Sequence, residues 1–80
     1  MIARPFIYAD FNNADPQGRL RLNVRGTIDD LARQGVHLEV NMPLVVYDEE
    51  LEADGAAQFP HEEQVWVAVI DWRPLRQKNA

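Results

Sequence analysis

The side chains that could carry out chemistry are few in this chain. The 80-residue sequence contains no cysteine and no serine, and Thr27 is its only threonine. Hydroxyl and thiol groups are the usual nucleophiles of covalent catalysis. The two histidines, His37 and His61, have no second histidine or cysteine at the spacing of a zinc site. We therefore expect a protein that is not an enzyme, with no catalytic, cofactor-binding or metal-binding residues.

Two acidic segments are candidates for binding a hard cation. Residues 48–54 hold five carboxylates in seven positions, but they lack the spaced ligands and the turn glycine of a calcium loop. We interpret them as a solvated loop or a strand edge guarded by charge, with cation binding as the alternative. Asp10–Asp15 has Ala14 where a ligand would be needed, so Asx-turn hydrogen bonds explain this segment better.

Three arginines recur with even spacing in the segment R-L-R-L-N-V-R. Arg19, Arg21 and Arg25 would share one face of an extended strand and form the only concentrated positive surface. This face is predicted either to bind phosphate, nucleic acid or an acidic protein, or to pair with acids of neighbouring strands. No aromatic residue alternates with the arginines, as it would in a strand that stacks bases. With Trp72, which lies near the end of an apolar run, they form the predicted interaction surface.

That apolar run, V-W-V-A-V-I-D-W at Val65–Trp72, is the strongest strand signal in the chain. It is rich in β-branched and aromatic residues and carries a single charge. Both of its alternating faces are apolar, whereas a solvated antiparallel strand normally has one polar face. We therefore predict a central strand that is covered on both sides.

Two hairpins are predicted around this strand. Phe6–Phe11 and Arg19–Arg25 are expected to pair across the turn formers of residues 12–18, which include Asp-Pro followed by glycine. Leu51–Phe59 is expected to return through a turn at residues 60–63 into the central strand. Gly55, in the middle of that segment, suggests a bulge or a bend.

A short helix is expected between the hairpins, near residues 27–34. Thr27 is predicted to cap it, with Asp30 in the position of a capping box, and Gly35 to end it. Ile28, Leu31 and Ala32 fall on one side, which we expect to dock on the sheet.

The segments that follow the helix alternate again. Val36–Val40 is predicted as a strand, Pro43 interrupts the pattern, and Leu44–Tyr47 resumes extended structure. Five to six strands with one short helix predict a mainly β fold, a small antiparallel barrel or rolled sheet of SH3-like size, with an open sheet packed on the helix as the alternative. Residues 1–75 are expected to form one domain and residues 76–80 a flexible tail.

The predicted function is protein–protein contact by a small non-enzymatic domain, with another protein or as a homodimer. A small barrel has one interior, so the second face of the central strand must be covered by the short helix or by another chain. The alternative is a nucleic-acid- or ribosome-associated barrel that uses the arginine-bearing face, although a net charge of −5 disfavours phosphate backbones. No apolar run is long enough to span a membrane. The absence of cysteine suits a reducing compartment, so we expect a cytoplasmic location.

Overall fold

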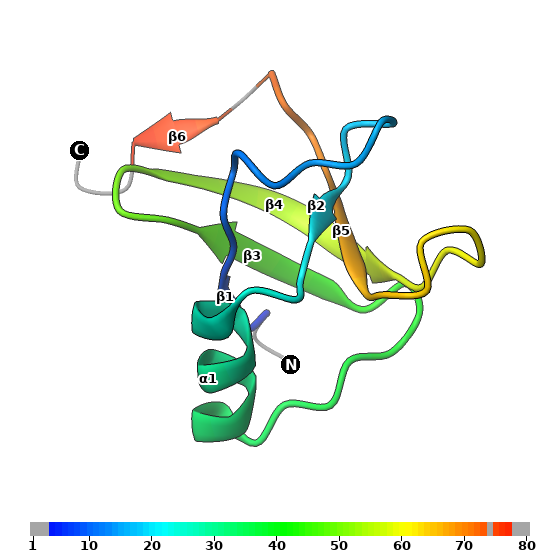
Figure 1. Cartoon of the computed structure of the whole chain (residues 1–80). Helices are drawn as coiled ribbons and strands as arrows, with labels where there is room; N and C mark the ends of the chain where they lie inside the picture. The colour runs from blue at the N-terminus through cyan, green and yellow to red at the C-terminus, as the bar shows by residue number, and fades with distance from the viewer. Residues whose placement is uncertain (1–3, 74, 78–80) are drawn as a thin grey trace.

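The sheet of this protein curls into a half-barrel, and a short helix lies at the sheet edge (Figure 1). The computed structural model describes residues 4–73 and 75–77. In chain order the elements are β1 (Phe6–Tyr8), β2 (Leu20–Arg21), α1 (Arg25–Gln34), β3 (Pro43–Tyr47), β4 (Leu51–Gln58), β5 (Val67–Ile70) and β6 (Arg76–Gln77). The strands follow the order β1–β3–β4–β5–β2, and β6 also pairs with β4. The predicted mainly β, rolled-sheet fold with one short helix is confirmed.

Strand β3 is the most deeply buried element. Leu44, Val45 and Val46 are each at most 2% exposed, and β3 has β1 on one edge and β4 on the other. Its pairing with β4 is antiparallel, whereas its pairing with β1 is parallel, with Phe6 opposite Val45. The predicted extended segment Leu44–Tyr47 is therefore confirmed, as a strand that is paired along both edges.

The core lies on the inner side of the curled sheet. Leu44 and Val46 of β3 point into it, together with small residues of the two strands that follow. The buried members of this core cluster are Ala9, Phe11, Leu20, Leu22, Leu44, Val46, Ala53, Ala57 and Ala68. Alanine on the inner side of β4 and β5 leaves room for the larger leucines and Phe11, because interiors are close-packed.

The second predicted hairpin is confirmed, with a shorter second strand. β4 and β5 are antiparallel, with Gln58 opposite Val67, but β5 covers only Val67–Ile70 of the predicted Val65–Trp72. The prediction that this strand is covered on both sides holds at Val67 and Ala68, which are fully buried, and fails at Val69, which is 45% exposed.

Gly55 does not form the predicted bulge. It lies opposite Leu44 on one side and Ile70 on the other, and the register runs through it without interruption. The absent side chain matters because the strands approach closely: a Cβ at this position would lie 2.8 Å from the carbonyl oxygen of Val69.

The first predicted hairpin is wrong as a strand pairing. β1 pairs with β3, and β2 pairs with β5 at the opposite end of the sheet order. The turn itself forms where it was predicted, because the Asp15 N–H donates to the Arg19 carbonyl (2.8 Å) and the Gly18 N–H donates to the Asp15 carbonyl (2.9 Å). The residues just before this turn pair with β2, because the Arg21 N–H donates to the Asn13 carbonyl (3.0 Å). The residues of β1 pair with β3 instead.

The helix begins earlier than predicted, and Thr27 does not cap it. Helix α1 starts at Arg25 with Val24 as its N-cap and no side-chain cap, whereas Gly35 ends it in the left-handed region (φ 66°) as predicted. The Thr27 hydroxyl donates to the Tyr8 carbonyl (2.5 Å), and Asp30 accepts the Tyr8 N–H (2.9 Å). A capping box requires both side chains to reach the helix's own backbone, and here both reach β1 instead.

The face of the helix that meets the sheet is polar. Thr27, Asp30 and Gln34 bond the free edge of β1, and the Gln34 amide donates to the Phe6 carbonyl (2.8 Å). The expected docking of Ile28, Leu31 and Ala32 on the sheet is therefore wrong: Ile28 and Ala32 are exposed, and Leu31 is half-buried. Polar side chains prevail here because the backbone groups of a strand edge need hydrogen-bond partners.

Two further predictions concern the segments after α1 and at the end of the chain. The predicted strand Val36–Val40 is absent, and this segment loops from α1 to β3 (Figure 1). Its alternation arises because Leu38 packs against the core while His37 and Glu39 are exposed.

In the predicted tail, Arg76–Gln77 form β6 beside Leu51 and Glu52, and residues 78–80 lie outside the described residues.

We predict that Asp30→Asn lowers the free energy of unfolding by about 2 kcal/mol at pH 7, the value of a hydrogen bond to a buried charge. Burial alone would raise the pKa of Asp30, but hydrogen bonds from the Tyr47 hydroxyl, the Tyr8 N–H and Arg33 outweigh it and lower the pKa. A lowered folded-state pKa contributes stability above the unfolded pKa of about 3.9, and that stability is lost as pH falls through the folded value. Urea unfolding measures this, and the difference in free energy of unfolding between wild type and variant should become smaller below about pH 4. A constant gap would contradict this assignment.

We also predict that Gly55→Ala destabilises the protein by about 1–3 kcal/mol, the usual cost of overpacking. The added Cβ would meet the Val69 carbonyl at 2.8 Å and the Ile70 side chain at 2.9 Å. Thermal unfolding followed by circular dichroism measures the effect. An unchanged unfolding temperature would contradict this prediction, because it would mean that β4 and β5 move apart at little cost to accommodate the methyl group.

Candidate functional site

Two of the predicted surface arginines are held in ion pairs. The Arg19 guanidinium contacts Asp15 (Nε–Oδ2 2.6 Å) and Glu62 (Nη2–Oε2 2.8 Å). Arg21 contacts Glu63 (Nε–Oε1 2.8 Å). This supports the pairing interpretation of the arginines, although the acids come from two turns rather than from neighbouring strands.

Asp15 is the buried centre of this network. Its side chain has no exposed surface, and it accepts the backbone N–H groups of Gln17 and Arg19, each at 2.9 Å. Burial would raise the pKa of this carboxyl, but hydrogen bonds from the backbone and the side chain of Arg19 lower it overall. Arg19 therefore supplies the positive charge that a buried carboxylate requires.

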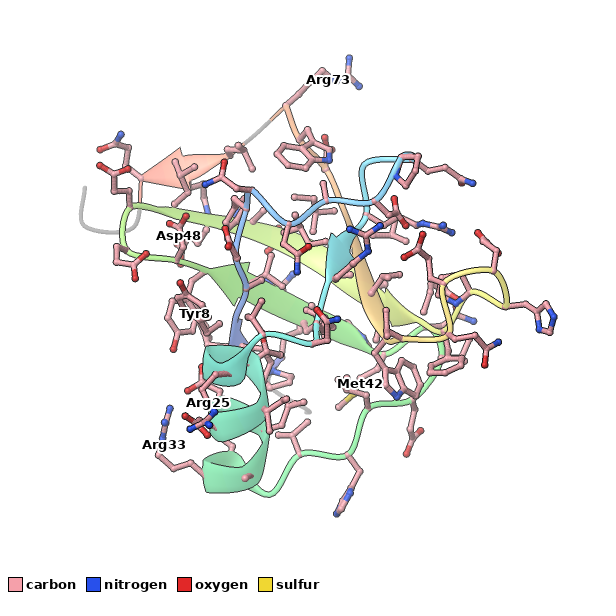
Figure 2. The ribbon with its side chains drawn as sticks, in the orientation of Figure 1. Tyr8, Arg25, Arg33, Met42, Asp48 and Arg73 are labelled. Carbon is pink, nitrogen blue, oxygen red and sulfur yellow. The ribbon has the colours of Figure 1, made fainter. Side chains whose placement is uncertain are left out.

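Arg25 lies apart from the other two arginines. It is the first residue of α1, and Figure 2 shows it beside the helix. It is exposed and, among residues 4–73 and 75–77, has no acidic side chain within 4 Å. The prediction of one strand face bearing Arg19, Arg21 and Arg25 is therefore wrong, because the strand ends at Arg21 and the chain enters the helix.

Trp72, the fourth predicted surface residue, lies just beyond β5 and is 41% exposed. Its indole N–H donates to the Gly18 carbonyl (2.8 Å), and its ring meets that of Phe11 edge to face, with centroids 6.2 Å apart. Trp72 thus connects the turn at residues 15–18 to the end of β5, and part of its ring is exposed at the surface.

Aspartates of the two acidic segments stabilise local turns of the backbone. Asp48 accepts the N–H groups of Glu50 and Leu51, and Asp10 accepts the N–H of Asn12, so both form the local turns typical of aspartate. His37 and His61 are exposed. In the described part of the chain, no three histidine, aspartate or glutamate side chains are grouped so as to hold a metal ion.

A different surface emerges on the outer side of the sheet, opposite the core. Ala56 of β4 lies opposite Val69 of β5, and residues that are opposite in register share a face. Asp54, two residues from Ala56, shares that face as well. β5 has β4 along one edge, whereas β2 pairs only with its residues Val67 and Ala68. Val69 lies just past the end of β2 and is 45% exposed, so the outer side of the sheet is open at this point.

A shallow, open hollow surrounds Val69. Asp54–Ala56 and Val69–Arg73 line it, and we call it the β4–β5 hollow. Its floor is apolar at Ala56 and Val69, and its rim is charged. Asp54 binds Arg4 (2.9 Å) and Arg76 (3.2 Å) at one end. At the other end Arg73 extends away from the sheet (Figure 2).

Of the predicted surface residues, only Trp72 belongs to this hollow. The sequence did contain a signal for it, the two apolar faces of residues 65–72, but alternation alone does not tell which of those valines is left uncovered. The neighbouring Asp54 was visible only as one acid among five in residues 48–54.

Comparisons of the chain with models of protein families, with curated proteins and with solved structures find no match. Within residues 4–73 and 75–77, no helix has the length and apolar composition needed to cross a membrane.

We predict that Arg19→Ala lowers the free energy of unfolding by about 2 kcal/mol, because a buried carboxylate loses its charged partner. Arg25→Ala is the matched control and should change it by less than about 0.5 kcal/mol, as is usual for exposed positions. Urea unfolding at pH 7 measures both. Equal effects of the two substitutions would contradict a structural role for the Arg19–Asp15 pair.

Proposed function

We propose that this chain is a small protein-interaction domain whose contact surface is the β4–β5 hollow. The observation that carries the proposal is the 45% exposure of Val69, which pairs with Ala56 of β4 and lies just past the end of β2. Valine in such a position is normally covered by a second layer, because a sheet buries at least one face and an apolar second face needs a cover as well. Another protein would supply that layer.

The position of α1 supports this proposal. The helix packs against β1 at one edge of the sheet, whereas β5 lies three strands away in the sheet order. Its polar face is occupied by bonds to β1. Helix α1 thus gives β5 no cover, and the sequence-based alternative in which the helix covers this face loses its support.

Surface composition points the same way. The hollow combines an apolar floor with a partly exposed tryptophan and an exposed arginine at its rim. Tryptophan and arginine are enriched among the residues that contribute most to protein–protein binding. The proposed location of this activity is the cytoplasm, since a chain without cysteine suits a reducing compartment.

The arginines give little support to the alternative function, nucleic-acid binding. Arg19 and Arg21 are engaged with Asp15, Glu62 and Glu63, so contact with phosphates would first have to replace these ion pairs. Nor does the proposal assign an enzymatic reaction. The single threonine hydroxyl is fully buried and donates to Tyr8.

We predict that Val69→Asp weakens the specific protein contacts of the chain, because it places a charge on the apolar part of the hollow. The full chain would be immobilised and exposed to an extract of its own cells, and retained proteins, copies of the chain included, would be identified and titrated in purified form. We expect at least about a tenfold loss of affinity, as at a central contact residue.

Val40→Asp is the matched control, because Val40 is a similarly exposed valine (57%) in the loop between α1 and β3. It should leave binding unchanged. If wild type and Val69→Asp retain the same proteins, or if neither retains any, the proposed function is wrong.

A further inference from the structure

We infer that α1 is a releasable cover of the β1 edge, which detaches and unfolds as a unit while the sheet and its core stay folded. Release of the helix uncovers the outer edge of β1, where the Phe6 carbonyl and both backbone groups of Tyr8 bond side chains of α1. This device is independent of the contact proposed at the β4–β5 hollow. Local opening of this kind occurs in elements that share little buried apolar surface with the rest of a protein.

In the described part of the chain, α1 contributes no side chain to the hydrophobic core. Its two buried residues, Thr27 and Asp30, are polar. Neither the core cluster nor the half-buried side chains packed against it include a residue of α1. Of its apolar side chains, Ile28 and Ala32 are exposed and Leu31 is half-buried. Detachment of α1 therefore uncovers little apolar surface, and burial of apolar surface is the main force that holds an element on its domain.

Polar bonds to the sheet hold the helix in place. The Thr27 hydroxyl and the Gln34 amide donate to carbonyls of β1, and Asp30 accepts the Tyr8 N–H (2.9 Å). Asp30 also accepts the Tyr47 hydroxyl of β3 (2.6 Å). The net contribution of such bonds is modest, because water replaces them when the helix leaves. Asp30, which is charged and bonds two strands, is the principal attachment.

The segments on both sides of α1 are anchored without it. Before the helix, Leu22 lies in the core, and its N–H donates to the Trp66 carbonyl (2.8 Å). After the helix, Leu38 packs against the core, and the Asn41 N–H donates to the Ala57 carbonyl (2.8 Å). These contacts do not involve α1, so they remain when the helix detaches.

A detached α1 would also lose its helical structure. The helix has ten residues, and its N-cap Val24 makes no side-chain hydrogen bond. Isolated helices shorter than about 12–15 residues are marginal in water. Docking on β1 and helix formation are thus one event, and the amide groups of α1 should open together with the Tyr8 N–H.

Native-state hydrogen exchange of the full chain at neutral pH, followed by NMR, tests this inference. The Tyr8 N–H bonds Asp30 of α1, whereas the N–H groups of Ala9 and Val45 bond between the β1 and β3 segments and are called the sheet amides. The α1 amides and Tyr8 should share one protection factor. It should be at least about tenfold below that of the sheet amides, which should exchange through global unfolding.

Two variants separate release of the helix from global unfolding. Gly55→Ala weakens the packing of β4 on β5 and should speed exchange of the sheet amides about tenfold or more. It should leave the α1 amides and Tyr8 unchanged, because the sheet is intact whether the helix is docked or released. Asp30→Asn should speed both sets about thirtyfold, because it weakens the docked state relative to every open state. Asp29→Asn, at the exposed neighbour of Asp30, is the matched control and should change neither set.

Equal protection of Tyr8, the α1 amides and the sheet amides in the wild type overturns the inference, since the helix would then open only with the whole molecule. So does a Gly55→Ala variant in which all these amides exchange faster by the same factor, or an effect of Asp29→Asn as large as that of Asp30→Asn. If Asp30→Asn does not fold, Thr27→Val replaces it. This variant removes only the hydroxyl bond to the Tyr8 carbonyl and should speed both sets about fivefold.

Discussion

The bonds between α1 and the outer edge of β1 govern how the rest of the molecule is arranged. The backbone of β1 pairs with β3 on one side, and the pairing continues in the bond from the N–H of Ala9, the residue after β1, to the Tyr47 carbonyl (2.9 Å). On the other side Thr27, Asp30 and Gln34 take the place of a further strand. An exposed strand edge can pair with other chains, and here polar side chains of α1 close it. Asp30 also accepts the Tyr47 hydroxyl (2.6 Å), so the same carboxylate ties the helix to β1 and β3.

This use of the helix leaves part of the outer side of the sheet uncovered, although Val45 and Val67 on that side are buried. A helix that buried Ile28 and Ala32 on the outer face would have covered an apolar strand, as helices usually do. Instead its polar side is turned to β1, and Ile28 remains 53% exposed. The inner side of the sheet is filled by the loops before and after the helix, which contribute Phe11, Leu22 and Leu38 to the core. The outer side is bare at Val69, and the proposed contact surface is therefore a consequence of how the edge of β1 is closed.

Two of the arginines likewise have a structural role, because they form ion pairs within the fold. Arg19 and Arg21 join the turn at residues 15–18 to the turn that connects β4 and β5, through Asp15, Glu62 and Glu63. The buried carboxylate of Asp15 makes this necessary, because a charge without a partner is costly in the interior. Only arginines that no buried acid claims, such as Arg73 at the rim of the hollow, are left to meet another molecule.

The sequence by itself determined the features that depend on neighbouring residues: the turn at Asp15–Gly18, the left-handed end of α1 at Gly35, the extended β3, and the hairpin of β4 and β5. Each follows from backbone preferences or from alternation over a few positions. Only the tertiary structure decided that β1 lies parallel to β3, that Thr27 and Asp30 serve β1 rather than their own helix, and that Val69 is uncovered. These outcomes depend on which backbone groups and which sheet face remain unsatisfied once distant segments have paired, and the spacing of residues along the chain does not carry that information.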